Sequence, residues 1–251
     1  MVANSKIQWT DHTFNPFIGC QKVSPGCDNC YAETLMDTRL GRVKWGPHGD
    51  RIKTSEANWR KPIAWAKHAP GFRLSHGRRQ RVFCASLSDW LDNKAPQEWR
   101  VELANLIEAT PELDWLLLTK RIENFERFNP WSEIGKIPFN VWIGVTAEDQ
   151  HHFDRRWKIL REIEAPVRFI SYEPAIGPLR LMAHDRAPDW LICGGESGAN
   201  PREMDRAWAR RIRDDCADYG TAFFMKQMTG KTGDDAIPTD LMIRQFPEPR
   251  R

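Results

Sequence analysis

Three cysteines fall within eleven residues near the start of the 251-residue chain. Cys20, Cys27 and Cys30 are spaced C-x6-C-x2-C, and the Pro25-Gly26 turn between them brings the first sulfur back toward the other two. A C-x2-C pair lets two thiolates bind one metal centre, and a third cysteine in a flexible loop can close on it. The spacing therefore predicts a metal site held by three thiolates.

Two kinds of metal centre suit three cysteines. Structural zinc takes four ligands, and a second C-x2-C or H-x3-H pair is missing here. An iron–sulfur cluster usually takes four cysteines, so a cubane on three leaves one iron free for a non-protein ligand. Asp28 and His12 are the nearest alternatives for a fourth protein ligand, although surface positions suit both. The residues alone leave zinc and iron–sulfur open.

The remaining cysteines point to packing. A disulfide scaffold is not expected in a chain of this length without a secretion signal. Cys193 and Cys216 are interpreted as core residues, since free cysteine is often buried. For Cys84 two interpretations stay open, packing toward a barrel lumen or donation of a hydrogen atom.

Short apolar runs alternate with stretches of helical periodicity along the chain. The predicted helices are Pro96–Ala109, Asp149–Ile163 and Asp205–Tyr219, the last stopped by Gly220. Such alternation predicts parallel strands joined by helices, and hence an α/β fold: a partial or complete TIM-type barrel, with a doubly wound open sheet as the alternative. The predicted strands are Phe14–Gly19, Val82–Ser86, Trp115–Thr119, Val141–Val145, Val167–Ser171, Trp190–Gly194 and Ala222–Lys226.

The barrel is predicted over residues 1–228, and two segments stand apart from it. Residues 51–81 form a basic insertion, whereas residues 229–251 form a tail or a cover over the barrel end. The cysteine loop follows the first predicted strand, which places it at the carboxyl face of the barrel.

Several predicted strands end in polar residues. Glu148, Glu173 and Glu196 follow three strands at matching depth, which predicts a shared site at the carboxyl face. Carboxylates can instead cap the following helix, and this is the favoured interpretation for Asp92 and Asp149. It also suits Asp89, although that residue stands with Ser86 and Ser88 at the end of the second strand.

The positive charge is concentrated in one segment. Nine basic residues and one acid give residues 51–81 a charge of +8, against +3 for the whole chain. Basic side chains neutralise phosphates, and the interleaved Trp59, Trp65 and Phe72 can stack on unpaired bases, although a solvated surface has the same composition. The nucleic-acid candidates are Arg60, Lys61, Arg73, Arg78, Arg79, Arg81, Lys120 and Arg121.

No membrane or secretion signal is apparent in the sequence. The apolar runs are far shorter than the ~20 residues that cross a bilayer, and the first residues lack the apolar region of a signal peptide. The expected location is the cytoplasm.

The cysteine loop after the first strand of a barrel resembles that of the radical S-adenosylmethionine (SAM) superfamily. The resemblance implies that Cys20, Cys27 and Cys30 hold a 4Fe–4S cluster whose fourth iron chelates SAM, and that reduction yields a 5′-deoxyadenosyl radical. The usual spacing there is C-x3-C-x2-C, so this loop carries three extra residues. Asn29 stands where an aromatic residue often precedes the last cysteine. The superfamily's Gly-Gly-Glu lies at its second strand, whereas Gly194-Gly195-Glu196 follows the sixth predicted strand, so that role is not transferred.

Nearly the whole chain also resembles a phage-associated three-cysteine family of uncharacterised proteins. The likeness rests on several short motifs taken together, and in outline the family is similar to spore photoproduct lyase, a radical enzyme that reverses a thymine lesion in DNA. The motifs are Phe14-Asn15-Pro16, Ser24-Pro25-Gly26-Cys27, Ser86-Leu87-Ser88-Asp89, Leu117-Leu118-Thr119-Lys120-Arg121, Ser171-Tyr172-Glu173-Pro174, Gly194-Gly195-Glu196-Ser197-Gly198 and Phe223-Phe224-Met225-Lys226-Gln227.

The resemblance implies a radical SAM enzyme that acts on nucleic acid, DNA favoured, with an electron donor as a second partner. Cys84, Glu148 and Glu173 are the catalytic candidates. Two further hypotheses stay open: a non-catalytic 4Fe–4S protein that binds DNA or senses redox state, and a zinc-stabilised nuclease or binding module. The candidates for binding SAM are Ser86, Ser88, Asp89, Thr146, Ser171 and Glu196.

Overall fold

The computed structural model describes residue 5 and residues 7–132, 135–182, 186–198, 200–230 and 233–249. Seven strands form one sheet, and each strand pairs with the one that follows it in the chain among these seven. The neighbouring strands whose register is defined run parallel. They are β1 (His12–Phe14), β4 (Gln80–Cys84), β5 (Leu113–Thr119), β6 (Val141–Thr146), β7 (Val167–Tyr172), β8 (Trp190–Gly194) and β9 (Ala222–Gln227).

The strand order decides between the two predicted architectures. A doubly wound sheet reverses its order at a switch point, whereas here each strand pairs with the next one in the sheet. The prediction of an α/β fold with a partial TIM-type barrel is therefore confirmed. Every residue of β6 and β7 is buried, as expected for parallel strands covered on both faces.

The first predicted strand is wrong in its bounds. β1 covers His12–Phe14, and the rest of the predicted run holds β2 (Phe17–Ile18), which pairs antiparallel with β3 (Ile52–Lys53) in a separate two-stranded sheet. Pro16 lies between β1 and β2, and proline has no N–H to donate to a ladder. The chain therefore leaves the main sheet earlier than the apolar run indicates.

The three predicted helices are confirmed within two or three residues. They are α5 (Gln97–Glu108), α7 (Gln150–Leu160) and α8 (Arg206–Tyr219). The Asp149 carboxylate accepts the His152 N–H at 2.9 Å and so caps α7, and Asp205 caps α8 through the Ala207 N–H at 2.8 Å. Gly220 takes the left-handed conformation, φ 69°, that ends α8.

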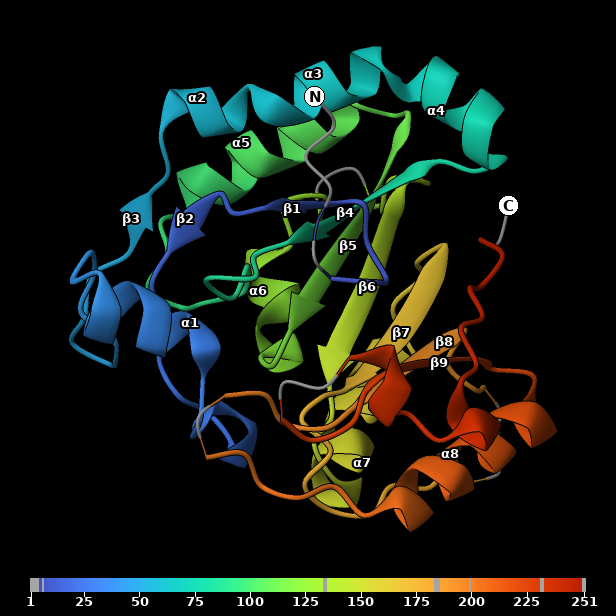
Figure 1. The fold of residues 1–251 in the computed structure, drawn as a ribbon. Helices are drawn as coiled ribbons and strands as arrows, with labels where there is room; N and C mark the ends of the chain where they lie inside the picture. Colours follow the sequence, from blue (N-terminus) through green and yellow to red (C-terminus); the bar gives the residue numbers. More distant parts are fainter. Residues whose placement is uncertain are drawn as a thin grey trace. The chain divides into compact units, whose positions relative to one another are not determined.

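The remaining helices are short. α1 (Tyr31–Glu33) continues into a π-helical stretch, Thr34–Arg39, and α6 (Phe125–Phe128) follows β5. Within the basic segment lie α2 (Glu56–Trp59), α3 (Lys61–Lys67) and α4 (Ala69–His76), which Figure 1 shows one after another in a row. Short 3-10 turns complete the set at Pro25–Cys27, Ile122–Asn124, Asp234–Ala236 and Thr239–Leu241.

The chain forms two compact units, and their boundary divides the cysteine loop. The first unit comprises Met1–Gln21, Ala32–Trp142 and Glu164–Pro166, whereas the second comprises Lys22–Tyr31, Ile143–Ile163 and Val167–Arg251. Cys20 therefore belongs to the first unit, and both Cys27 and Cys30 belong to the second.

The segment after β9 folds back along that strand within the second unit. Arg244 forms an antiparallel bridge with Phe224, and the Trp190 indole N–H donates to the Gln245 carbonyl at 3.0 Å. The Phe246 ring packs 5.3 Å from the rings of both Trp190 and Phe224, centroid to centroid. These residues cover the free edge of β9 with backbone contacts and aromatic packing.

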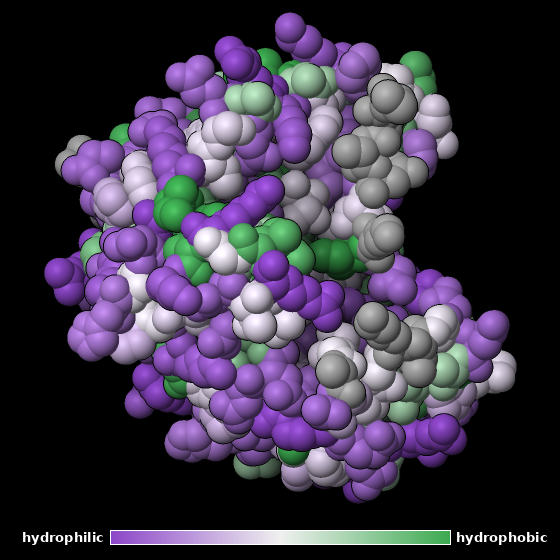
Figure 2. All heavy atoms as spheres, turned by 60° about the vertical axis from the view of Figure 1, so that its left-hand side comes forward, coloured by the Kyte–Doolittle hydropathy of each residue, from purple (hydrophilic) through white to green (hydrophobic). Residues whose placement is uncertain are grey.

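The surface agrees with the composition. The face shown in Figure 2 is mostly hydrophilic, with hydrophobic residues gathered in small patches. In the described part of the chain, no helix is both long enough and apolar enough to cross a membrane.

Candidate functional site

Cys20 is fixed in the first unit by its backbone. Its carbonyl accepts the Gly46 N–H at 2.9 Å, and the Gly19 N–H before it donates to the Leu87 carbonyl at 3.2 Å. Gly19 has φ 102°, and a Cβ there would lie 2.6 Å from the Asp50 carbonyl oxygen, so this close approach needs glycine. The cysteine thus sits on a well-defined turn.

Arg121 contacts the sulfur of Cys20. Its Nη1 donates to Cys20 Sγ at 3.3 Å and to Asp89 Oδ2 at 3.2 Å, and its Nη2 donates to the Gln21 carbonyl at 2.8 Å. The Arg121 side chain is 4% exposed. This guanidinium therefore faces the candidate metal ligand from inside the protein.

The ionisation of this pair follows from burial and charge. Burial raises the pKa of the Cys20 thiol to about 12, although the Arg121 guanidinium acts in the opposite direction. Burial also opposes the charged form of Arg121, but Asp89, Cys20 and Asp92 outweigh it and raise the pKa of Arg121 above its ordinary value. Without a metal, Cys20 is a neutral thiol beside a permanent cation.

The end of β4 carries two predicted serines. The Ser86 hydroxyl bonds the Asn15 side chain, and Asn15 Oδ1 also accepts the Leu87 N–H at 2.7 Å. Ala85 before them has φ 67°, an unfavourable conformation for a residue with a Cβ. Among the described residues the buried Ser88 Oγ has no hydrogen-bond partner. A bound ligand would supply that missing partner.

In the second unit, Glu196 holds the loop that carries Cys27 and Cys30. Its Oε2 accepts Asn29 Nδ2 at 2.8 Å, the Arg202 N–H at 2.8 Å and Arg202 Nε at 3.0 Å. Arg202 also pairs with Oε1 of Glu196 and donates to the Pro25 carbonyl at 2.9 Å. The carboxylate predicted to bind SAM thus accepts hydrogen bonds from Arg202 and from Asn29 of the cysteine loop.

Glu148 holds the same loop from the end of β6. It is fully buried, its Oε2 lies 2.6 Å from Arg156 Nη1, and its Oε1 accepts the Gly26 N–H at 3.3 Å. Arg156 Nη1 donates in addition to the Thr146 carbonyl at 2.8 Å. A Cβ on Gly26 would lie 3.1 Å from the Glu148 carboxyl carbon, so only a small residue permits this approach.

Replacing Glu196 by Gln tests the first of these anchors. Burial alone would raise the pKa of the Glu196 carboxyl, but hydrogen bonds from Arg202 and Asn29 hold it below the ordinary 4.5. We expect Glu196→Gln to lower the free energy of unfolding by about 2 kcal/mol at pH 7, since an amide cannot accept every bond that the carboxylate accepts.

The pH dependence of this stability loss follows from the direction in which the pKa of Glu196 is shifted. A carboxyl whose pKa is lower in the folded chain than in the unfolded chain stabilises the fold at pH values above its unfolded-state pKa. This stabilisation is lost as the pH falls through the folded-state pKa. The difference in unfolding free energy between wild type and Glu196→Gln, measured by urea unfolding, should therefore become smaller below about pH 4.5. An equal gap at pH 7 and pH 3 would contradict the assignment.

Glu173 and Lys226 meet at the ends of β7 and β9. Lys226 Nζ lies 2.6 Å from Glu173 Oε1, and the Ser171 hydroxyl donates to Glu173 Oε2 at 3.4 Å. A Cβ on Gly194 would lie 2.6 Å from Glu173 Oε1, so the glycine leaves room for this carboxylate. The two side chains are 13% and 22% exposed, so a ligand can reach this pair.

The six cysteines divide into two groups by exposure. Cys20, Cys27 and Cys30 are partly exposed. Cys84, Cys193 and Cys216 are buried, as predicted for the last two, and burial raises the pKa of the Cys84 thiol. In the described ranges, no three His, Cys, Asp or Glu side chains are grouped as metal ligands.

The basic candidates differ in exposure. Arg60, Lys61 and Arg73 are exposed, and Lys120 is half-buried. Arg78 pairs with Asp11 at 2.7 Å and Arg79 with Asp114 at 2.6 Å.

Two of the basic candidates, one of them outside the basic segment, are buried in the first unit. The side chains of Arg81 and Arg121 are buried. The aromatic rings also pack internally: Trp65 stacks on His12 at 4.2 Å, and Trp59 meets Phe14 edge-on at 5.5 Å. Only a part of the +8 segment faces solvent.

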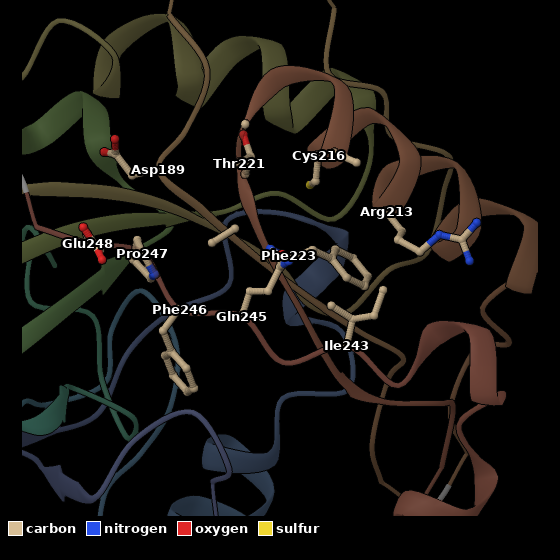
Figure 3. Close-up of a pocket in the computed structure, with 13 residues that line it drawn as sticks. Asp189, Arg213, Cys216, Thr221, Phe223, Ile243, Gln245, Phe246, Pro247 and Glu248 are labelled. Atoms are coloured by element: carbon tan, nitrogen blue, oxygen red, sulfur yellow. Dashed lines mark hydrogen bonds between the residues drawn. The ribbon is translucent and has the colours of Figure 1, made fainter. Parts of the chain in front are cut away.

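A separate hollow of about 560 Å³ lies in the second unit (Figure 3). Its lining comes from the end of α8, the start of β9 and the segment that follows β9, including Cys216, Phe223 and Gln245. It thus opens at the amino ends of the strands, whereas ligands of parallel barrels bind at the carboxyl ends. None of the predicted site residues lines it.

Sequence reasoning missed the partners that hold these groups. Arg156 and Arg202 act through bonds to Glu148 and Glu196, and Asn29 bonds Glu196 from the position where an aromatic residue was expected. The departure at Asn29 was the one available signal, because an amide at a fixed loop position implies a polar partner. Nothing in the spacing marks either arginine.

Comparisons with known proteins identify a family for the chain and solved structures with a similar fold. The chain belongs to the family described as "Protein of unknown function (DUF5131)", whose model matches residues 4–242. No curated protein matches the chain.

Two solved structures of spore photoproduct lyase share the fold. A cysteine-to-serine variant has a TM-score of 0.53 at 10% sequence identity, over 90% of this chain and 78% of that chain. A tyrosine-to-phenylalanine variant has a TM-score of 0.52 at 10% identity, over 91% of this chain and 79% of that chain. At this identity the likeness shows the fold alone.

Proposed function

We propose that this member of the DUF5131 family is a radical SAM enzyme that acts on nucleic acid, in lesion repair or base modification. One observation supports it most: a three-cysteine loop accompanies a partial barrel that is similar in fold to spore photoproduct lyase. The proposed location is the cytoplasm, where thiols stay reduced. Association with phages stays a prediction from the sequence.

The donor set fits a 4Fe–4S cluster. Cys20, Cys27 and Cys30 are partly exposed cysteines, and soft thiolates are the ligands that iron–sulfur clusters take. The unpartnered hydroxyl of Ser88 adds a polar group suited to a bound small molecule. When bound, the cluster and SAM supply a 5′-deoxyadenosyl radical, after one electron from a low-potential donor cleaves the sulfonium to release methionine.

The protein's own residues order the cysteine loop. Glu196 with Arg202, and Glu148 with Arg156, hold the backbone between Pro25 and Asn29. This ordering presets the two sulfurs of the C-x2-C pair, and a preset site loses less conformational entropy on binding. Ser86, Ser88, Thr146 and Ser171 are proposed to line the SAM site.

The reachable polar pair is proposed to face the substrate. Lys226 and Glu173 retain solvent contact, so they can orient a phosphate or a base edge. Cys84 is fully buried at the end of β4, so we propose that it packs in the interior rather than donating a hydrogen atom to the substrate.

Anaerobic reconstitution tests the enzyme class. The protein is incubated with iron and sulfide, its iron, sulfide and visible absorption are measured, and it is then reduced with dithionite in the presence of SAM. We expect about four irons and four sulfides per chain and formation of 5′-deoxyadenosine. A colourless protein with one zinc would instead support the zinc-stabilised module, and a cluster without 5′-deoxyadenosine would support the non-catalytic protein.

The exposed part of the basic segment provides the test for nucleic acid. We expect the triple variant Arg60→Ala, Lys61→Ala, Arg73→Ala to bind duplex DNA at least tenfold more weakly at 0.1 M salt. The slope of log K against log salt should fall by about 2 to 3, since each phosphate contact contributes ~0.9. Fluorescence anisotropy at several salt concentrations measures both.

A matched triple variant controls for total charge. Lys158→Ala, Arg206→Ala and Arg211→Ala remove the same number of exposed lysines and arginines from α7 and α8. Equal losses in the two triple variants would show that only net charge matters, and would refute a binding face on α3 and α4.

A further inference from the structure

We infer that Arg121 is a positioning residue for the metal ligand Cys20, and that its N–H···S hydrogen bond makes the bound cluster easier to reduce. This inference rests on the proposed function, because it concerns the same three-cysteine centre. It assigns Arg121 a role other than the phosphate contact that the basic sequence pattern predicts.

The hydrogen bonds of Arg121 fix the orientation of its side chain. Its backbone N–H donates to Thr119 Oγ1 at 2.8 Å, and Thr119 in turn donates to Asp89 Oδ1 at 2.7 Å. The other oxygen of Asp89 accepts Arg121 Nη1 at 3.2 Å and the Lys120 N–H at 2.9 Å. The end of β5 and the Asp89 carboxylate thus fix the guanidinium on both sides.

From this position the two Nη atoms reach the start of the cysteine loop. Nη1 lies 3.3 Å from Cys20 Sγ, within the hydrogen-bond range of sulfur, while Nη2 binds the Gln21 carbonyl at 2.8 Å. One planar group therefore fixes both the sulfur and the next peptide of the loop. A lysine has no such pair of N–H groups in one plane.

Arg121 belongs to a buried network of charged side chains. Arg51 and Arg121 pair with the carboxylates of Asp89 and Asp92, whereas Arg100 donates to the backbone carbonyl of Asp92. Arg51 and Asp92 are 2.9 Å apart with side chains 2% and 0% exposed. A metal-bound Cys20 thiolate would give the Arg121 guanidinium a further negative partner beside these carboxylates.

Reduction of the cluster adds one further negative charge beside the same guanidinium. Hydrogen bonds to cluster sulfurs and nearby positive charge favour the reduced form and so raise its reduction potential. Arg121 offers both, at the sulfur of one ligand. Its removal should therefore shift the midpoint potential to more negative values.

The variants Arg121→Met and Arg121→Lys test this on the full chain after anaerobic reconstitution. The readouts are iron per chain and the midpoint potential from a redox titration followed by electron paramagnetic resonance. We expect Arg121→Met to make the one-electron reduction about tenfold less favourable, a shift of about 59 mV to more negative potential, and Arg121→Lys to fall between it and wild type. Arg210→Met, which removes an exposed arginine on α8 that pairs with Asp240, serves as the control.

The outcomes separate the two proposals. Wild-type protein without iron refutes the proposed function itself. A wild-type cluster whose midpoint potential is unchanged in the Arg121 variants overturns only the inference. Should Arg121→Met fail to fold, Arg121→Lys decides alone, since it keeps a cation beside Asp89 and loses the planar pair of donors.

Discussion

Replacing Cys20, Cys27 or Cys30 by Ala is expected to abolish cluster binding. Each single variant should hold less than one iron per chain after anaerobic reconstitution, against about four in wild type, and should lose the visible absorption. Formation of 5′-deoxyadenosine should fall by at least 100-fold. The physical reason is that a cubane with only two protein thiolates exchanges them readily for thiols in solution.

The buried cysteines provide the control for that prediction. Cys193→Ala and Cys216→Ala remove thiols that are fully buried, and both variants should keep the iron content of wild type. Each should lose about 1 kcal/mol of unfolding free energy to the small cavity that it leaves. Iron retained in Cys27→Ala, or iron lost equally in all five variants, would refute the assignment of the ligands.

Replacing Arg156 by Met is expected to have the largest effect on stability. Arg156 and Glu148 form an ion pair at 2.6 Å with side chains 3% and 0% exposed. Removing Arg156 takes the guanidinium away from the buried Glu148 carboxylate, which keeps His152, 3.7 Å away, as a more distant neighbour, and this costs about 4 kcal/mol. The Thr146 carbonyl loses its guanidinium donor as well. Urea unfolding at pH 7 measures the loss as a lower midpoint at an unchanged slope.

Two further variants distinguish the ion pair from the helix that carries it. Lys158→Met changes an exposed residue of the same helix and should alter the unfolding free energy by less than 0.5 kcal/mol. The double variant Glu148→Met, Arg156→Met removes both charges and should recover more than half of the loss. A single Arg156→Met variant as stable as wild type would show that the buried carboxylate needs no cation.

The sequence predicts this fold well because buried parallel strands can be recognised in it directly. β8 occupies the predicted residues, and β5, β6, β7 and β9 differ from prediction by one or two residues, since strands buried on both faces are continuous apolar runs. The first strand fails for a local reason. Phe17 and Ile18 are as apolar as the core, yet Pro16 ends the ladder before them.

The candidate site is predictable in its residue types but not in its pairing. Glu148, Glu173 and Glu196 do follow three strands, as the alternation of the sequence indicates. Their partners lie anywhere from a few residues to more than a hundred residues away along the chain, as with Gly26 and Glu148, and no periodicity encodes such contacts. The role of a residue that depends on its hydrogen-bond or ion-pair partner can therefore be assigned only from the three-dimensional structure.

Charge counting has the same limit in the basic segment. Arg51 and Arg81 contribute to its +8, yet the first pairs with the buried Asp92 and the second is itself buried. A run of arginines in a sequence does not separate those that face solvent from those that complete an interior network.

The segment that folds back along β9 has a consequence for how the protein behaves at high concentration. An uncovered parallel strand offers a row of backbone donors and acceptors to any other extended chain, and so seeds association between molecules. Here Ile243 and Gln245 already occupy part of that row, and Phe246 shields the indole of Trp190. Proteolytic removal of the residues after Met242 would therefore expose this strand edge and favour association between molecules.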